Sequence, residues 1–240
     1  MNYCILNGKK STMVKGLLIQ SLPSIIKPLM RTRVEEIDGR DGEIITQLGY
    51  AAYDKEMSIG LFGDYDISEV IDYFNSEGEV IFSNELDRVY KYKIINQIDF
   101  ERLGIFKTAI VTFRVEPFKY SSVDDSITIT DGAGVTKSKT LTNYGNVYSK
   151  PLIYIYGCPS NFTLTLDGKT LTISSPTSSN ILIDVDKMNA YYLSDGSYAN
   201  RAISGDYSAF ALKPKGLNGN VLTWTGTCSQ IVIKNLSRWI

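Results

Sequence analysis

The chain has 240 residues, of which 43% are hydrophobic and 21% charged, a composition typical of globular proteins rather than disordered or membrane-embedded chains. Lys and Arg total 25 against 26 Asp and Glu, so no net field of either sign points to nucleic acid or an anionic bilayer as the main partner. The sequence contains no histidine, which excludes Ser-His-Asp and Cys-His catalysis and the common zinc sites that use histidine.

The first residues, MNYCILNGKKSTMVKG, lack the basic run, apolar core and cleavage site of a signal peptide. The longest apolar runs, such as LIYIY at 152–156, fall far short of the ~20 residues that cross a bilayer. We therefore expect synthesis in the cytoplasm and no membrane insertion. Cys4, Cys158 and Cys228 form no CxxC pair, and we expect three free thiols packed as small apolar side chains.

Residues 31–42, RTRVEEIDGRDG, combine arginines with two Asp-Gly dipeptides, Asp38-Gly39 and Asp41-Gly42. Such dipeptides are typical of turns, so we expect a loop here. Its charges either pair with a partner subunit or are solvated between two strands. Exposed charge pairs contribute little by themselves, so the residues alone leave both interpretations open.

The segment 66–78, DISEVIDYFNSEG, has helical periodicity. Four apolar residues are spaced to share one helix face: Ile67, Val70, Ile71 and Phe74. Asp66 is a candidate N-cap, Glu69 resembles the acidic partner of a capping box, and Gly78 lies just beyond the end. We expect a helix near 67–76 that lies on a sheet.

Residues 108–116, TAIVTFRVE, alternate between apolar and polar side chains, with Ile110 as the exception. This period of two predicts a half-buried strand whose buried face carries Ala109, Val111, Phe113 and Val115. After residue 122 the charge-rich first half gives way to Thr, Ser, Asn and Gly. We therefore expect two domains, 1–122 and 123–240.

The second half has few charges and short β-branched or aromatic runs at spacings of roughly 8–12 residues, which predicts a β-sandwich. The strand candidates are Leu152–Tyr156, Phe162–Leu166, Leu171–Ile173, Ile181–Val185 and Ile231–Ile233. Asp167-Gly168 is the strongest hairpin signal. Further turn signals are Asp131-Gly132, Asn143–Asn146 and Asn218–Asn220.

The acidic pairs Glu35-Glu36 and Asp124-Asp125 do not predict acid–base catalysis, because neighbours in an extended strand point to opposite sides. The fragment Gly132-Ala133-Gly134 lacks the strand–helix context of a phosphate site, so a hairpin tip is favoured.

Asp184, Asp186 and Asn189 offer oxygen atoms for a hard cation, but their spacing lacks the glycine and terminal glutamate of a calcium loop. A strand end that enters a turn is the favoured interpretation. Trp224 and Trp239, with sixteen tyrosines, suit either sugar stacking or interfaces, and a core position is favoured for Trp224. We predict no catalytic residue, no cofactor and no metal site.

Several features then follow in a specific order: LPSIIKPLMRTRVEEIDGRDG at 22–42, the helix near 67–74, DRVYKYKI at 87–94 and a strand ending VEPFKY at 115–120. This order resembles the N-terminal domain of the distal tail proteins (Dit) of long-tailed, siphovirus-type bacteriophages and prophages. Gly39-Arg40-Asp41-Gly42 is the part most similar to a family signature.

The second half continues the resemblance. NYGN at 143–146, followed by SKPLI at 149–153, is similar to the entry into the family's C-terminal domain. Ile183-Asp184, Gly205-Asp206-Tyr207, Leu217-Asn218 and Arg238-Trp239-Ile240 follow in the family's order. One departure is Pro214-Lys215-Gly216-Leu217-Asn218, where the family often has a Pro-Gly-x-Asn turn. The length resembles the short form of the family, without a large carbohydrate-binding insertion.

The resemblance implies a mainly β fold. Residues 1–122 would form an N-terminal β-sandwich-like, ring-forming tail domain with one helix and a long hairpin, and residues 123–240 a C-terminal galectin-like β-sandwich. It also implies a structural hub of a phage tail tip or baseplate, a hexameric ring that joins the tail tube to tail-tip and host-recognition proteins. The location would be the virion tail, assembled in the bacterial host cytoplasm.

The implied partners are other copies of the chain, the tail tube protein, the tail-associated lysin or tail-tip protein, and receptor-binding or peripheral baseplate proteins. No nucleic-acid sequence recognition is expected. Ring contacts join distinct patches on each subunit, and segments 31–42 and 84–90 suit that use because they are polar and rich in turn residues. The candidate interface residues are Arg31, Arg33, Asp38, Arg40, Asp41, Asp87, Arg88 and Tyr90.

Two alternatives belong to other classes of function. A carbohydrate-binding adhesion module that contacts the host surface is consistent with the aromatic content, although galectin-type sugar sites typically rely on a histidine. An enzyme would rest on unpaired carboxylates and free thiols, with no visible nucleophile–base arrangement.

Overall fold

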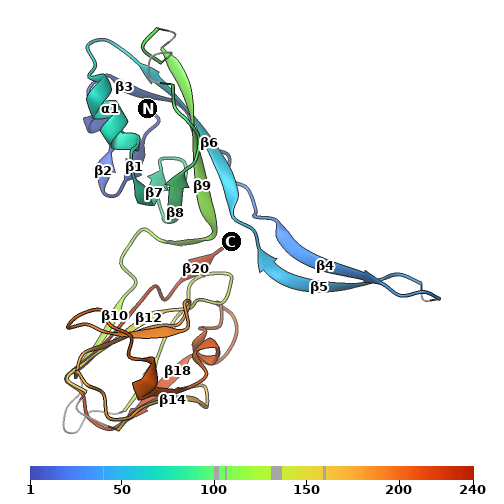
Figure 1. Ribbon diagram of the computed structural model, residues 1–240, viewed down its shortest axis with the longest axis vertical. Helices are drawn as coiled ribbons and strands as arrows, with labels where there is room; N and C mark the ends of the chain where they lie inside the picture. The colour runs from blue at the N-terminus through green and yellow to red at the C-terminus, as the bar shows by residue number, and fades with distance from the viewer. Residues whose placement is uncertain (40, 100–102, 106, 131–136, 159–160) are drawn as a thin grey trace. The chain divides into compact units, whose positions relative to one another are not determined.

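The computed structural model describes residues 1–240 except 40, 100–102, 106, 131–136 and 159–160. The chain divides into two compact units: an N-terminal unit of Met1–Ser122 with Ile240, and a C-terminal unit of Val123–Trp239. Antiparallel strands make up most of the secondary structure in both (Figure 1). This confirms the predicted mainly β fold class.

The N-terminal unit contains one antiparallel sheet, in the order β2-β1-β7-β8-β9-β6-β3, and a separate two-stranded hairpin, β4-β5. The strands are β1 (Cys4–Leu6), β2 (Lys9–Lys10), β3 (Leu17–Ser21), β4 (Met30–Glu36), β5 (Glu43–Tyr50), β6 (Tyr53–Leu61), β7 (Glu77–Phe82), β8 (Arg88–Ile94) and β9 (Thr108–Ser121). A 3-10 turn, η1 (Ser11–Met13), lies between β2 and β3.

Strand β9 contains the predicted strand 108–116 and extends beyond it. Val111, Phe113 and Val115 are fully buried, whereas Ile110 is exposed on the other face. The period of two therefore predicted this strand correctly, including its exception. The buried side chains pack in one core with the sheet and helix α1 (Ile67–Phe74).

Helix α1 confirms the predicted helix but is shorter, and three details were wrong. Ile71 is 36% exposed, and Tyr73 is buried in its place. Asp66 caps the helix as predicted by accepting from the Ser68 and Glu69 backbone N–H groups. The Glu69 carboxylate instead accepts from the Lys15 backbone N–H and from Lys9 Nζ, each at 3.2 Å. Gly78 lies within β7 and does not cap the helix.

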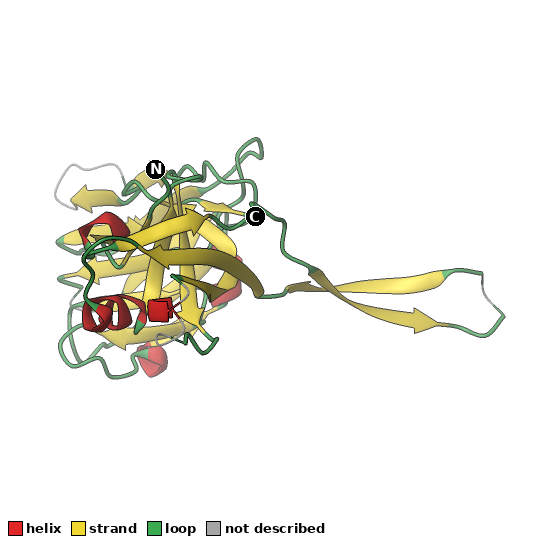
Figure 2. Cartoon of the chain, turned by 90° about the horizontal axis from the view of Figure 1, so that it is seen from above, coloured by secondary structure: helices red, strands yellow, loops and turns green. Residues whose placement is uncertain are grey.

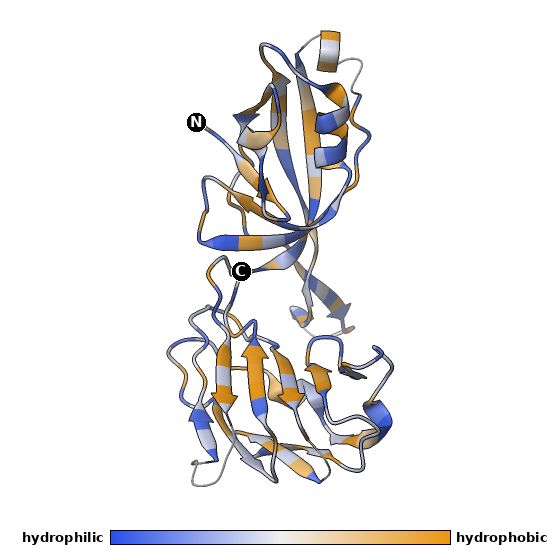
Figure 3. Cartoon of the chain, turned by 90° about the vertical axis from the view of Figure 1, so that its left-hand side faces the viewer, coloured by the Kyte–Doolittle hydropathy of each residue, from blue (hydrophilic) through white to orange (hydrophobic). Residues whose placement is uncertain are grey.

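The C-terminal unit is a sandwich of two five-stranded antiparallel sheets, β10-β19-β12-β15-β16 and β11-β18-β13-β14-β17. The strands are β10 (Ile127–Thr130), β11 (Ser138–Thr140), β12 (Leu152–Tyr156), β13 (Phe162–Leu166), β14 (Lys169–Ile173), β15 (Ile181–Asp184), β16 (Asn189–Tyr192), β17 (Ile203–Gly205), β18 (Val221–Thr225) and β19 (Gln230–Lys234), with 3-10 turns η2 (Asn200–Ala202) and η3 (Tyr207–Phe210). The short strand β20 (Arg238–Trp239) follows β19 and is part of neither sheet. Figure 3 shows the hydrophobic residues along these strands.

Local turn chemistry explains two features of this sandwich. Asp167 and Gly168 adopt φ values of 47° and 81° between β13 and β14, the left-handed pair that a two-residue hairpin turn needs. Asn143 is buried and accepts from the Gly145 N–H, while its own Nδ2 donates to the carbonyls of Val147 and Leu212. The predicted turn at 143–146 is thus part of a buried hydrogen-bond network.

Predictions for single residues also have outcomes. Trp224 is in the core of the C-terminal unit, and the thiols of Cys4, Cys158 and Cys228 are buried and form no disulfide. Asp184 ends β15 and accepts from the Lys187 N–H in the following turn, as expected for a strand end. The glycines of the GxG fragment and the turn signal at Asp131-Gly132 lie outside the described residues.

Candidate assembly interface

The β4-β5 hairpin, residues 30–50, is the most exposed element of the N-terminal unit, and we call it the arm. In the described part of the chain its two strands pair only with each other, and nearly every residue along them is exposed. Figure 2 shows them side by side as a two-stranded ribbon. Isolated hairpins are marginally stable in water, and unpaired strand edges are templates for another chain.

Apolar side chains lie on this exposed ribbon. Val34 and Ile45 are directly opposite each other, with exposed fractions of 49% and 60%. Leu48 lies at the bulge beside Arg31 and is also exposed. On the other face Arg33 pairs with Glu35 at 2.9 Å. Because directly opposite residues share a face, the Val34–Ile45 pair forms a compact apolar contact point.

The described part of the arm carries four of the eight predicted interface residues, with one correction. Arg31 and Arg33 are on strand β4 and not in a loop, because the chain there pairs with β5. Asp38 and Asp41 lie in the turn region beyond β4, and both are exposed. Arg40 lies outside the described residues.

The second predicted segment, 84–90, divides in the structure. Asp87 pairs with Arg88 at 2.7 Å near the start of β8. Tyr90 is completely buried, packs against Phe82 and donates its hydroxyl hydrogen to Glu85. Its placement at an interface is corrected: Tyr90 is a core residue, because β8 turns this side chain toward the sheet interior.

The connection between the sheet and the arm, residues 22–29, is held by side chains that the sequence reasoning missed. Asn84 Nδ2 donates to the carbonyl of Pro23 at 2.9 Å, and Lys55 Nζ donates to the carbonyl of Ser24 at 2.8 Å. Lys55 occupies a buried position in β6, in phase with Tyr53 and Met57. The signal in the sequence that could have identified Lys55 was a lysine at a position where the alternation of the strand places an apolar side chain.

Lys55 lies in a buried polar cluster. Its Nζ is 4.7 Å from the Tyr90 ring centroid and 5.6 Å from that of Phe82. Burial lowers the pKa of Lys55 to about 8, with the neighbouring positive charge of Lys119 acting in the same direction and Glu85 opposing. The Glu85 carboxylate accepts from Lys119 Nζ at 2.8 Å.

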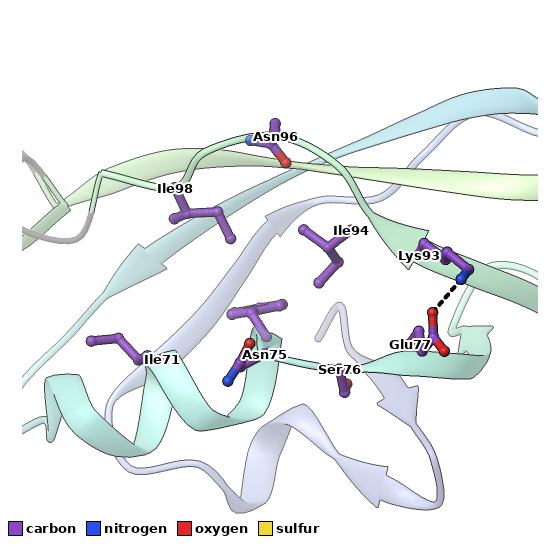
Figure 4. A pocket seen from close by; sticks show the side chains of 9 residues that line it. Ile71, Asn75, Ser76, Glu77, Lys93, Ile94, Asn96 and Ile98 are labelled. Carbon is purple, nitrogen blue, oxygen red and sulfur yellow. Dashed lines mark ion pairs between the residues drawn. The ribbon is translucent and has the colours of Figure 1, made fainter.

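A shallow depression of about 600 Å³ lies between the end of α1, the edge of β7-β8 and the chain after β8 (Figure 4). Ile71, Ile94 and Ile98 line it together with the amides of Asn75 and Asn96, and the Glu77–Lys93 ion pair closes one side. This mixed apolar and amide lining suits contact with another polypeptide surface.

Two of the three cysteine thiols are poor nucleophiles. Burial raises the pKa of the Cys4 and Cys158 thiols to about 11, the opposite of an activated nucleophile. Among the described residues no group of three or more Cys, Asp or Glu is placed to hold a metal ion. No described helix is long and apolar enough to cross a bilayer.

The two outer faces of the C-terminal sandwich differ in chemistry. Across the sheet that contains β12, one row runs from Thr128 through Val232, Tyr154 and Leu182 to Tyr191. Across the other sheet, a row of hydroxyl residues runs from Ser138 through Thr223 and Thr165 to Thr170. The first face carries aromatic and aliphatic side chains that are only half-buried, which is typical of a contact surface.

Fold and surface together define a two-unit, mainly β protein with an exposed arm. No protein-family model and no curated protein sequence matches it. Among solved structures, the Dit protein of phage SPP1, described as a paradigm of the hub adsorption apparatus in phages that infect Gram-positive bacteria, matches over 100% of both chains, with a TM-score of 0.66 and 19% identity. A chain of the phage p2 baseplate in its activated conformation matches over 98% of this chain and 97% of its own length, with a TM-score of 0.50 and 10% identity. The chain therefore has the Dit fold over its whole length, as the ordered motifs implied.

Proposed function

We propose that this protein is the structural hub of a phage tail tip or baseplate. Six copies form a ring through their N-terminal units, and the ring joins the tail tube protein to the tail-associated lysin or tail-tip protein. The C-terminal units carry receptor-binding or peripheral baseplate proteins. The observation that carries this proposal is the fold similarity to a hub protein over the full length of both chains.

The exposed surface of the arm supports the proposal of a ring. A ring is built from heterologous contacts, in which one patch of each subunit binds a different patch on the next. The arm supplies such a patch, because it exposes the Val34–Ile45 pair and free strand edges. Docking on a second copy would cover both features.

Sedimentation of full-length protein tests the role of the arm. Ile45→Glu places a charge at the apolar contact point and is expected to prevent assembly, whereas Thr46→Glu, on the opposite face of the same strand, is expected to retain it. Equal assembly of both variants with wild type would sink the proposal that the arm makes the ring contact. Negative-stain images of the assembled species then give the number of subunits.

A second candidate function, binding of a host polysaccharide, is favoured by the aromatic row on the β12 sheet. Tyr154 and Tyr156 lie with ring planes 10° apart and centroids 6.5 Å apart, and such rings stack on sugars or on protein partners. Calorimetric titration of cell-wall polysaccharide into the full chain tests it. Saturable binding that is lost in Tyr154→Ala and kept in Thr165→Ala, on the opposite sheet, would support it; no heat of binding would exclude it.

A further inference from the structure

The linker that leads from the sheet to the arm, residues 22–29, is held at two consecutive backbone carbonyls. Residues 22–29 form no regular secondary structure, and Pro23 and Pro28 lack the N–H that a strand ladder requires. The carbonyls of Pro23 and Ser24 nevertheless have defined partners, Asn84 Nδ2 and Lys55 Nζ. Asn84 follows β7 and Lys55 lies on β6, so two different elements of the sheet hold adjacent residues of the linker.

The burial of Lys55 reduces the free energy of unfolding. Its exposed fraction is 3% and that of Lys119 is 6%. Glu85 supplies the carboxylate that this cluster has among the described residues. That carboxylate already binds Lys119 and the Tyr90 hydroxyl. Two buried ammonium groups thus share one carboxylate, and a buried charge without its own counter-ion destabilises a folded protein.

The Lys55 ammonium donates a hydrogen bond to the Ser24 carbonyl oxygen, and a charged donor makes a stronger hydrogen bond than a neutral one. We propose that Lys55 and Asn84 form a latch that fixes the direction in which the arm leaves the sheet. Two attachments at neighbouring residues prevent the pivoting that a single attachment allows. The latch therefore positions the arm to dock on a second copy. The docking rests on the proposed function, whereas the latch itself does not.

The matched control lies in the same cluster. Lys55→Met and Lys119→Met remove the same charge from equally buried positions, but only Lys55 contacts the linker. Asn84→Ala removes the other half of the latch without changing any charge. These three variants separate the latch from general electrostatics of the cluster.

Pulsed electron paramagnetic resonance measures the arm's direction. Spin labels are placed at Thr46→Cys on the arm and Glu79→Cys on β7, both exposed positions, while the three native cysteines are buried. Wild type and Lys119→Met are expected to give one narrow distance distribution. Lys55→Met and Asn84→Ala are expected to lose it and give a broad one. A narrow distribution in both latch variants, or equal broadening in Lys119→Met, would overturn the latch.

Assembly of the same variants keeps the two proposals apart. If the latch variants broaden the distance distribution but sediment as wild type does, the latch stands, but docking of the arm does not depend on it. If they lose assembly while the distribution stays narrow, the latch fails and the docking role is untouched. Loss of both is the expected result.

Discussion

Glu85→Gln is the most informative single change in the N-terminal unit. The amide keeps the shape of the side chain and an oxygen for Lys119 Nζ, but it removes the negative charge that Lys55 and Lys119 share. Breaking a buried ion pair by neutralising one partner costs about 3–5 kcal/mol, because the remaining charge is left buried. Domains are stable by about 5–15 kcal/mol, so the loss is a large part of the total.

Urea denaturation followed by two probes measures this loss. Trp224 lies in the core of the C-terminal unit, so in a Trp239→Phe background its fluorescence reports that unit, while far-UV circular dichroism follows both units. With an m-value of about 1.5–2 kcal/mol/M, the urea concentration at the midpoint of unfolding of the N-terminal unit should fall by about 1.5–3 M. The tryptophan transition should not move.

Glu35→Gln is the matched control, because Glu35 pairs with Arg33 on the exposed arm and surface pairs contribute about 0–1 kcal/mol. A loss below about 1 kcal/mol for Glu85→Gln as well would mean that the cluster behaves like a solvated surface pair. That result would refute the reasoning about buried charge.

Three further predictions follow from the same structure. Because the pKa of Lys55 is held at about 8 against 10.5, the unfolded chain binds this proton more tightly between those values, and the wild-type N-terminal unit gains up to about 3 kcal/mol as pH rises through this range. Above pH 10 the pKa of Tyr53, raised by burial to about 12, acts in the opposite direction. Urea titrations at pH 7 and 9.5 should show the gain in wild type and not in Lys55→Met; a gain of equal size in both would contradict the assignment. Asp66→Ala removes the acceptor for two N–H groups of α1 and should cost about 1 kcal/mol in the same titration, with no change expected for Asp64→Ala and none in the tryptophan signal. Gly145→Ala would make a Cβ overlap with the Arg238 carbonyl oxygen and should lower the thermal midpoint of the C-terminal unit; a folded Gly145→Ala with an unchanged midpoint would show that this contact relaxes freely.

Those parts of the fold that depend on local chemistry could be predicted from sequence. The strand β9 has one buried face, so its period of two is visible. The Asp167-Gly168 turn needs left-handed residues wherever the hairpin lies. The cap at Asp66 likewise acts within one turn of helix.

The misses share a physical cause, since each depends on partners far away in the sequence. Tyr73 replaces Ile71 on the buried face of α1 because its hydroxyl donates to the Cys4 and Lys9 carbonyls. Strand β4 has no buried face, so alternation gives no signal there. A lysine such as Lys55 is expected at the surface, and only the packed sheet reveals its contact with Ser24.

The proposed function requires that copies of this chain assemble into a tail-tip ring. Electron microscopy of purified tails, with the protein localised by an antibody against the arm-deleted chain, tests it most directly. A six-fold ring is expected at the distal end of the tail tube, and tails should lack this ring when Ile45→Glu replaces the wild type. Label elsewhere on the particle, or a ring of a different symmetry, would contradict it.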